Sequence, residues 1–380
     1  MTGRILRLGR VRMLWLAGGV LTICGLFFWD GPLLRQGIQD GLATCGSVII
    51  PALFPFMVLT MFINQSGLAA AFGRVLAPIT RFLFGLPGAA AATLCMAFVG
   101  GYPVGTAGVS ALYKNRLITK NQAVRMLFFC VGAGPAFILS AVGGIWFGSH
   151  QAGLLLLGAH LAGGLTLGVA SGVYGHIKGE VAPPPPIDGA PAGGASKEKR
   201  PKLSDCFVSA TSAAAKTLFV LCGFVVLFSG LSALLADLPL PETMRPLATG
   251  LLEVTGGCAA AAGQSSLPLA AFLLGFGGLS VLCQLMTAAK EITPPMAPLL
   301  AGRLLHGLIS FAVVKGVLCF RPDTIAALSG GASPITKTGS GHFAYAVPWP
   351  ASLALIFLSL VLIGSIRHTN INPGGSRPRT

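Results

Sequence analysis

Long apolar segments interrupted by glycine pairs constrain the fold of this chain more than any other feature of its sequence. Two of them, at residues 88–113 and 267–290, are long enough to cross a hydrocarbon core of about 30 Å, which needs roughly 20 helical residues. Each contains a Gly-Gly pair, at 100–101 and 277–278. Inside lipid, non-helical backbone is tolerated only where it faces protein or a water-filled cavity. The pattern therefore predicts an all-α, polytopic membrane protein whose broken helices line a cavity.

Composition supports a membrane protein and argues against other classes. Hydrophobic residues make up 53% of the 380 residues, charged residues 10%, and the mean hydropathy is +0.78, whereas soluble domains carry about a quarter charged residues. The net charge of +15 comes from basic residues beside apolar runs, which is typical of cytoplasmic flanks. Basic and aromatic residues do not interleave as they do on RNA-binding surfaces, so we expect no nucleic-acid partner. We expect a multi-pass protein of the bacterial inner membrane, with the lipid bilayer as its surroundings.

Nine apolar segments follow one another along the chain. They cover residues 13–29, 42–63, 88–113, 125–148, 152–177, 207–236, 267–290, 296–320 and 348–366. The first follows four arginines and lacks a small-residue cleavage site after it, so we expect an uncleaved membrane helix. Pro51 and Pro55 are expected to break the second segment, and the Gly-Ala-Gly-Pro sequence at 132–135 the fourth.

A segment rich in proline, glycine and charge divides the apolar body into two comparable portions. Residues 179–202 contain almost nothing to bury and are expected to form a disordered linker. The predicted organisation has five parts. These are an N-terminal membrane helix and its flank at 1–41, a first repeat plus a connecting helix at 42–178, the linker at 179–202, a second repeat at 203–320, and a loop, last membrane helix and basic tail at 321–380.

The two portions share a weak sequence repeat. Residues 98–111 match 275–288, with the glycine pairs in register. We therefore predict two repeats, each containing a Gly-broken, re-entrant helical hairpin. Charge counting that starts with the N-terminus inside places the two halves in opposite orientations, so the repeats are expected to be inverted. The same counting leaves the C-terminus outside, whereas arginines at 367, 377 and 379 favour the inside.

Each glycine break is expected to form half of a binding site. The half-helices that follow the breaks, expected to begin at Val104 and Val281, present free N–H groups and the positive end of a helix dipole. Two such breaks that face each other form the usual site of a secondary transporter and favour an anionic group. Alternatively, the glycines only allow close helix packing. The predicted substrate-binding residues are Gly100, Gly101, Tyr102, Pro103, Val104, Thr106, Ser110, Gly277, Gly278, Ser280 and Gln284.

Four ionisable residues in or beside apolar stretches are candidates for function, because charge there is costly and functional by default. Glu253 either couples a proton or Na+ to transport or caps a helix. Lys216 either extends to the membrane interface or contacts an anion. Arg303 and His306 are three residues apart and share one helix face, where they bind a carboxylate or hold backbone carbonyl groups.

Enzymatic chemistry is not expected from this sequence. The nine cysteines show no spacing typical of a zinc site, and no Walker A sequence is present. We therefore expect no metal and no cofactor. Ser280 followed by His306 faintly suggests a hydrolase dyad, but no GxSxG turn supports it.

Several motifs resemble the sporulation integral membrane protein YlbJ family, which belongs to the wider nucleoside recognition, or Gate-domain, group. They are Pro-Ala-Leu-Phe-Pro-Phe at 51–56, Gly-Leu-Pro-Gly at 85–88 and Gly-Gly-Tyr-Pro-Val-Gly at 100–105, with softer matches at 218–229, 252–256, 275–280 and 303–306. The resemblance covers about residues 40 to 320 and makes both repeats Gate-like. It implies alternating-access transport of a small organic anion similar to dipicolinate around the developing endospore. Alternatives are a transporter of nucleosides or other neutral solutes, and a non-transporting scaffold or sensor in sporulation. A homo-oligomer is compatible with the sequence.

Overall fold

A computed structural model describes residues 31–180 and 202–320, together with Gly18 and Gly25. Within these residues the chain is helical and contains no β-strand. Three predicted parts lie outside the described residues. They are the first membrane helix at 13–29 apart from Gly18 and Gly25, the linker at 179–202 except for its ends, and the last helix and tail at 321–380.

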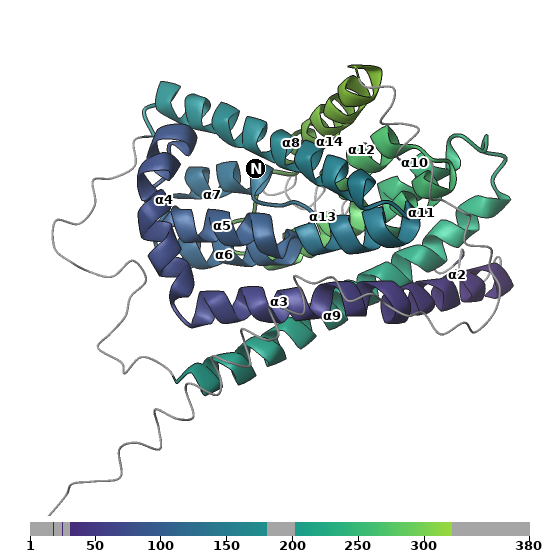
Figure 1. Ribbon diagram of the computed structural model, residues 1–380, viewed down its shortest axis with the longest axis horizontal. Helices are drawn as coiled ribbons and strands as arrows, with labels where there is room; N and C mark the ends of the chain where they lie inside the picture. Colours follow the sequence, from purple (N-terminus) through teal and green to yellow (C-terminus); the bar gives the residue numbers. More distant parts are fainter. Residues whose placement is uncertain (1–17, 19–24, 26–30, 181–201, 321–380) are drawn as a thin grey trace, which may run out of the picture.

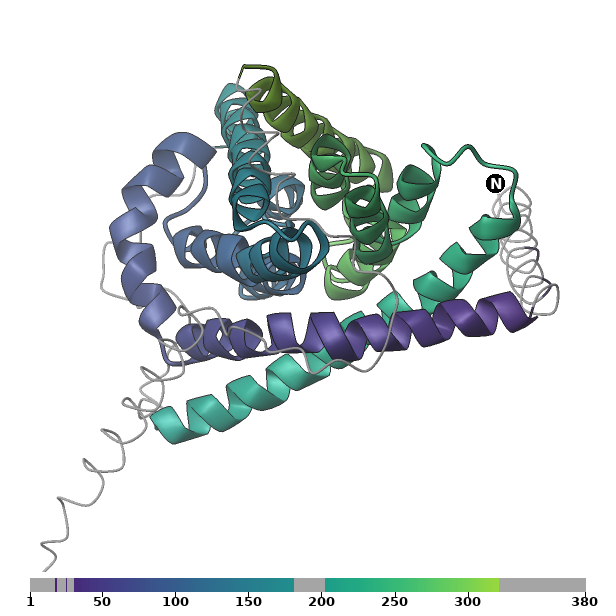
Figure 2. The same cartoon turned by 45° about the vertical axis from the view of Figure 1, so that its right-hand side comes forward.

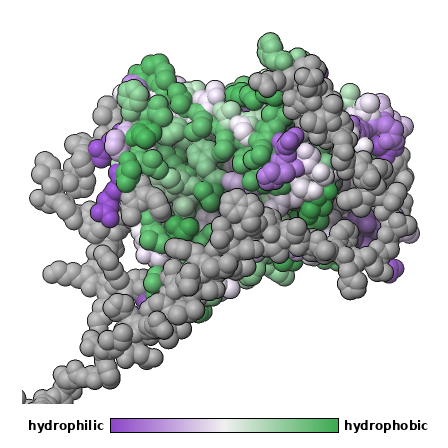
Figure 3. Space-filling model, in the orientation of Figure 1, coloured by the Kyte–Doolittle hydropathy of each residue, from purple (hydrophilic) through white to green (hydrophobic). Residues whose placement is uncertain are grey.

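Five helical stretches in the described part are long and apolar enough to cross a membrane. They are Gly31–Gln65, His150–Ile177, Leu203–Ala233, Leu267–Ala288 and Met296–Phe320. Large apolar side chains face outward, since Phe82 and Phe219 are each 81% exposed. Figure 3 shows such side chains over much of the visible described surface, with hydrophilic ones gathered mostly toward its left and right ends. The all-α, multi-pass membrane fold predicted from composition is confirmed.

Two very long helices cross beneath the rest of the molecule (Figure 2). One is continuous through α2 (Gly31–Thr44), the π-helical turn η1 (Cys45–Ile49) and α3 (Ile50–Gln65), and the other is α9 (Leu203–Ala233). The predicted break at Pro51 and Pro55 is therefore wrong. The π turn explains the difference: its wider hydrogen bonds, such as Ile50 N–H to the Cys45 carbonyl, accommodate the missing N–H of a following proline.

The remaining helices of the first half follow α3 in a compact order. They are α4 (Leu68–Phe84), α5 (Ala90–Gly100), α6 (Tyr102–Lys114), α7 (Lys120–Phe129), the π-helical η2 (Phe137–Trp146) and α8 (His150–Ile177). The second half continues after α9. It comprises η3 (Leu234–Asp237), α10 (Arg245–Leu252), α11 (Val254–Gly263), α12 (Leu267–Phe276), α13 (Gly278–Ala288) and α14 (Met296–Phe320).

Packing shows that the two halves share one order of elements. Helices α5 and α6 lie side by side as a hairpin (Figure 1), and so do α10 and α11. By contrast, α7 and η2 make few contacts with each other, as do α12 and α13, so each of these pairs is an interrupted helix. In each half a hairpin precedes an interrupted helix and then a long helix, α8 or α14. The long helices α8 and α14 pack against each other.

This order of elements corrects the prediction of a hairpin at Gly277. The break at Gly277 interrupts a single stretch, Leu267–Ala288, instead of turning a hairpin. The hairpin of the second half turns at Glu253, so by element order Gly101 corresponds to Glu253 and not to Gly277. Local glycine content marks where a helix breaks, whereas packing partners decide whether the chain turns back. The inverted orientation of the halves and the re-entrant placement of the hairpins stay predictions.

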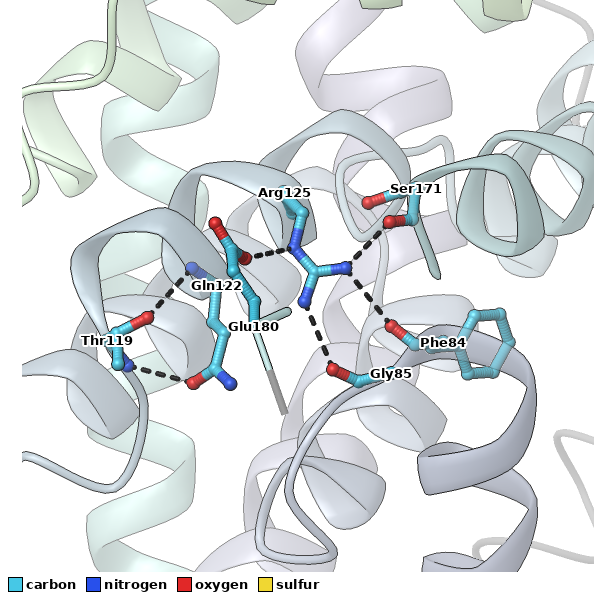
Figure 4. A network of polar contacts seen from close by, with 7 residues as sticks. All are labelled: Phe84, Gly85, Thr119, Gln122, Arg125, Ser171 and Glu180. Atoms are coloured by element: carbon cyan, nitrogen blue, oxygen red, sulfur yellow. Dashed lines mark hydrogen bonds and ion pairs between the residues drawn. The ribbon is translucent and has the colours of Figure 1, made fainter. Parts of the chain in front are cut away.

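The start of α7 is fixed by a capping box (Figure 4). Thr119 Oγ1 accepts the Gln122 N–H at 3.2 Å, and Gln122 Oε1 accepts the Thr119 N–H at 2.9 Å. Two N–H groups that a helix end leaves unpaired are thereby satisfied. The cap fixes the direction in which α7 approaches the break that follows it.

Arg125 on α7 holds three segments together (Figure 4). Its guanidinium donates hydrogen bonds to the carbonyls of Phe84 at 3.4 Å, Gly85 at 3.0 Å and Ser171 at 2.6 Å. Its Nε pairs with a Glu180 carboxylate oxygen at 3.1 Å. Arg125 is 4% exposed. The end of α4, the body of α8 and the residue just beyond α8 are therefore joined to α7 through one side chain.

Substituting Arg125→Met is expected to lower the stability of the protein by about 3 kcal/mol, because three carbonyls and a partly buried carboxylate lose their partner. Thermal unfolding in detergent measures the effect. Arg116→Met, at an exposed position in the turn before α7, is the matched control and is expected to change the melting temperature little. Equal melting temperatures for the two variants would contradict this role of Arg125.

Candidate functional site

A small cavity of about 60 Å³ lies where the two halves meet, and we name it the central cavity. The tip of the α5/α6 hairpin, the Glu253 turn and the first residues of α13 contribute to its wall. Most of the remaining wall is apolar and comes from α3, η2 and α9. Seven of the predicted site residues line it: Gly100, Gly101, Tyr102, Pro103, Glu253, Ser280 and Gln284.

A larger cavity of about 300 Å³ adjoins the central one, and we name it the side cavity. Both cavities are lined by Tyr102, Pro103, Val281 and Gln284. The side cavity adds two predicted residues, Thr106 and Lys216. The structure thus brings together predicted residues from both halves of the chain around two neighbouring spaces.

The tip of the first hairpin rests on the break of the first interrupted helix. Gly101 has φ 79° and ψ −167°, a conformation that is essentially restricted to glycine. A Cβ atom there would lie 2.8 Å from the backbone nitrogen of Gly134, which belongs to the break between α7 and η2. Only a residue without a side chain allows this approach of two backbones.

The second half repeats this arrangement. Gly278, at φ 75°, lies so close to the Glu253 turn that a Cβ atom would be 2.9 Å from the Gly250 carbonyl oxygen and 3.2 Å from that of Leu252. In each half, therefore, the turn of a hairpin contacts the break of the interrupted helix that follows it. The sequence indicated a break at 132–135 and a notable residue at Glu253. It did not indicate that the break would contact Gly101 or that the Glu253 turn would contact Gly278.

Tyr102 joins the two halves at the cavity wall. Its hydroxyl donates a hydrogen bond of 2.6 Å to the Leu274 carbonyl, one of the last in α12 and without a helical partner. Further along α6, Ser110 Oγ donates to the Ala288 carbonyl at 2.8 Å. The α6 and α13 half-helices lie next to each other in consequence. Ser110 lines neither cavity, so its role here is to connect helices.

Other predicted positions differ from expectation. Helix α6 begins at Tyr102 and α13 at Gly278, earlier than the predicted starts at Val104 and Val281. Val104 is buried against residues of α4 and α5 and does not line the cavities, although Val281 does. Glycine and proline are compatible with the first helical turn, so the break itself serves as the helix start.

Glu253 takes the helix-capping role proposed for it from the sequence, and its coupling role stays a prediction. It is 2% exposed and lies in extended conformation between α10 and α11. Its carboxylate accepts hydrogen bonds from the N–H groups of Thr255 at 2.9 Å and Gly256 at 2.7 Å, so it caps α11. It also lines the central cavity.

Arg303 and His306 lie behind the cavities and hold backbone groups. Arg303 is fully buried, donates to the carbonyl of Val131 in the first break, and contacts His306 Nδ1 through its other amino group. His306 Nε2 donates to the His160 carbonyl at 2.9 Å. These contacts match the structural alternative predicted for the pair, and carboxylate binding by it stays a prediction. Both ring nitrogens of His306 are therefore engaged in contacts within the protein.

Sequence reasoning missed His160, a buried histidine on α8. Its ring stacks on that of His306 with 4.5 Å between centroids. A Cβ atom on Gly132 would lie 2.5 Å from its Nε2, so the first break passes close to this ring nitrogen. An ionisable residue inside an apolar helix was the signal that could have revealed it.

Lys216 lies deeper in its helix than the sequence suggested. Helix α9 begins at Leu203, so Lys216 is about 20 Å along it at a rise of about 1.5 Å per residue. The side chain is exposed and lines the side cavity. A cation placed midway along a long apolar helix, at the wall of a cavity, is typical of a solute path.

Comparison with known proteins supports the resemblance seen in the motifs. The family model described as "Gate: Nucleoside recognition" matches residues 47–149, which include the first hairpin and the first interrupted helix. The chain is 28% identical over 320 residues to the sporulation integral membrane protein YlbJ of Bacillus subtilis (strain 168), covering 76% of this chain and 78% of that protein. No solved structure matches the chain. The similarity to YlbJ and to the Gate group that was expected from the sequence is confirmed.

Proposed function

We propose that this protein is a secondary transporter that moves a small organic anion, dipicolinate or a similar dicarboxylate, by alternating access. The observation that carries the proposal is the meeting of two hairpin turns and two helix breaks around a cavity between matching halves. Unwound backbone inside a membrane protein is tolerated where it lines a polar space. Transporters place their solute sites at such interfaces between repeats.

Two features favour an anion over a neutral solute. Lys216 supplies a positive charge to the side cavity, and α13 begins at the central cavity, where the positive end of its dipole and free N–H groups attract negative charge. The side cavity, at about 300 Å³, suits a small ring compound. Gln284, shared by both cavities, offers a neutral hydrogen-bonding group between these positive features.

A nucleoside is the second candidate, because the matching family model is described as nucleoside recognition. The two candidates differ in charge, so a charge-neutralising variant separates them. A scaffold or sensor that uses the glycines for packing alone would transport neither solute.

Uptake into proteoliposomes tests the proposal. Labelled dipicolinate is expected to enter liposomes that contain the protein, with saturation, while a panel of labelled nucleosides does not. Lys216→Gln is expected to reduce dipicolinate uptake about tenfold by removing the charge that faces the anion. Lys315→Gln, at an exposed position on α14, is the matched control and is expected to keep wild-type uptake. Nucleoside uptake that is insensitive to Lys216→Gln would support the second candidate, and no uptake of either solute would contradict transport.

A further inference from the structure

Glu253 is a buried carboxylate in the wall of the space through which the anion is proposed to pass. It is 2% exposed, and the other polar side chains of that wall, those of Tyr102, Thr255, Ser280 and Gln284, are uncharged. Within the described residues, the three ion pairs join other side chains, and none includes Glu253. Lys216 lines the side cavity and not the central one. The central cavity therefore has an acidic group in its wall and no basic side chain.

An anionic solute and an ionised Glu253 oppose each other in this space. A cavity of about 60 Å³ brings any carboxylate inside it close to the Glu253 carboxylate. Like charges in a poorly hydrated site repel strongly, and the usual resolution is that one of them binds a proton. Resting on the proposed function, we propose that Glu253 is the proton-binding site that couples anion movement to proton movement, so that the solute and one proton cross together.

The chemistry of the site favours a proton over Na+ as the coupling ion. Each carboxylate oxygen of Glu253 already accepts one backbone N–H, from Thr255 or Gly256. A proton needs only one remaining lone pair, whereas a metal cation needs several oxygen ligands around it. Across the described residues, no group of three or more His, Cys, Asp or Glu side chains could hold a metal ion.

Among the titratable side chains around the central cavity, Glu253 is the one expected to change charge near neutral pH. The thiols of Cys45 on η1 and Cys258 on α11 and the phenol of Tyr102 on α6 are the titratable groups near it. Helix α12 and η2 carry no titratable side chain, and α13 carries the thiol of Cys283. Helix α10 carries Arg245 at its start, where it pairs with Glu242, and α9 carries the thiol of Cys222 and, at the side cavity, Lys216. Thiols and phenols are uncharged near neutral pH, so the charge of this wall depends on Glu253.

Linkage gives the expected behaviour of the wild-type protein. If proton binding favours anion binding, anion binding favours proton binding by the same factor. With the membrane potential held at zero by K+ and valinomycin, an inside-alkaline gradient of about one pH unit is expected to give about tenfold accumulation of dipicolinate for one proton per solute. Replacing Na+ with choline is expected to change nothing. A pH dye inside the liposomes should report acidification when dipicolinate is added outside.

The variant Glu253→Gln separates coupling from passage. It is expected to lose gradient-driven accumulation while exchange of labelled for unlabelled dipicolinate continues, because exchange needs no net proton movement. Glu242→Gln, at an exposed position before α10, is the matched control and should accumulate dipicolinate as the wild type does. Size-exclusion chromatography checks folding of both variants. If Glu253→Gln does not fold, the dye measurement on the wild-type protein decides the proposal without it.

The outcomes distinguish this inference from the function on which it rests. Saturable dipicolinate uptake that is unaffected by the pH gradient, that follows a Na+ gradient, or that acidifies nothing would overturn proton coupling and leave anion transport standing. Accumulation retained by Glu253→Gln would overturn the assignment to this residue. Absence of any dipicolinate flux would overturn both proposals together.

Discussion

Gly101→Ala is expected to reduce transport at least about tenfold and to destabilise the protein by about 2 kcal/mol. The backbone of Gly101, at φ 79° and ψ −167°, is one that residues with a side chain rarely adopt. The added Cβ atom would also lie 2.8 Å from the Gly134 nitrogen, so the hairpin tip and the break of α7 and η2 must separate. Because both surfaces line the central cavity, their separation changes the site itself. Dipicolinate flux and thermal unfolding measure the two effects.

Gly223→Ala is the matched control for this experiment. Gly223 lies on an exposed face of α9, and an added Cβ atom would meet nothing within 4 Å. Alanine favours helix over glycine by about 1 kcal/mol, so the control should unfold at the same temperature or higher and transport normally. Wild-type flux in Gly101→Ala would show that the hairpin tip does not need close contact with Gly134, and the proposed site would lose its main support.

Arg303→Met is expected to lower stability by about 3 kcal/mol and to reduce flux, because the Val131 carbonyl and His306 Nδ1 would lose their partner in a buried region. The substitution also has a stabilising effect, because it removes a buried charge whose desolvation costs free energy. We expect the lost hydrogen bonds to dominate, because two buried polar groups and the ordered break next to His160 depend on one guanidinium.

Melting temperatures in detergent, with dipicolinate flux as a second readout, measure the effect of Arg303→Met. Arg74→Met on α4, where the side chain is exposed, is the matched control and should leave both quantities nearly unchanged. A rise in the melting temperature of Arg303→Met would mean that the cost of burying the charge exceeds the value of its hydrogen bonds.

Local features of the sequence determined the class of fold and the positions of most breaks. Apolar length and low charge are sufficient for an all-α membrane protein, because lipid forces backbone groups into helices. The breaks at Gly101, Gly277 and 132–135 were predictable because glycine and proline weaken a helix wherever they occur. Six of the seven predicted residues around the central cavity lie at the Gly101 break or on the helix that follows Gly277, whereas Glu253 was predicted from its charge.

Tertiary packing decided what each break does and which side chains meet there. Whether a broken segment turns back or continues depends on its neighbours: α12 packs along α14 and continues into α13, whereas α5 lies beside α6 and forms a hairpin. The contact of His160 with His306 and that of the Glu253 turn with Gly278 also depend on residues far apart in the chain. Hydropathy and glycine content are properties of a short stretch of sequence. They do not specify which distant part of the chain will pack against that stretch.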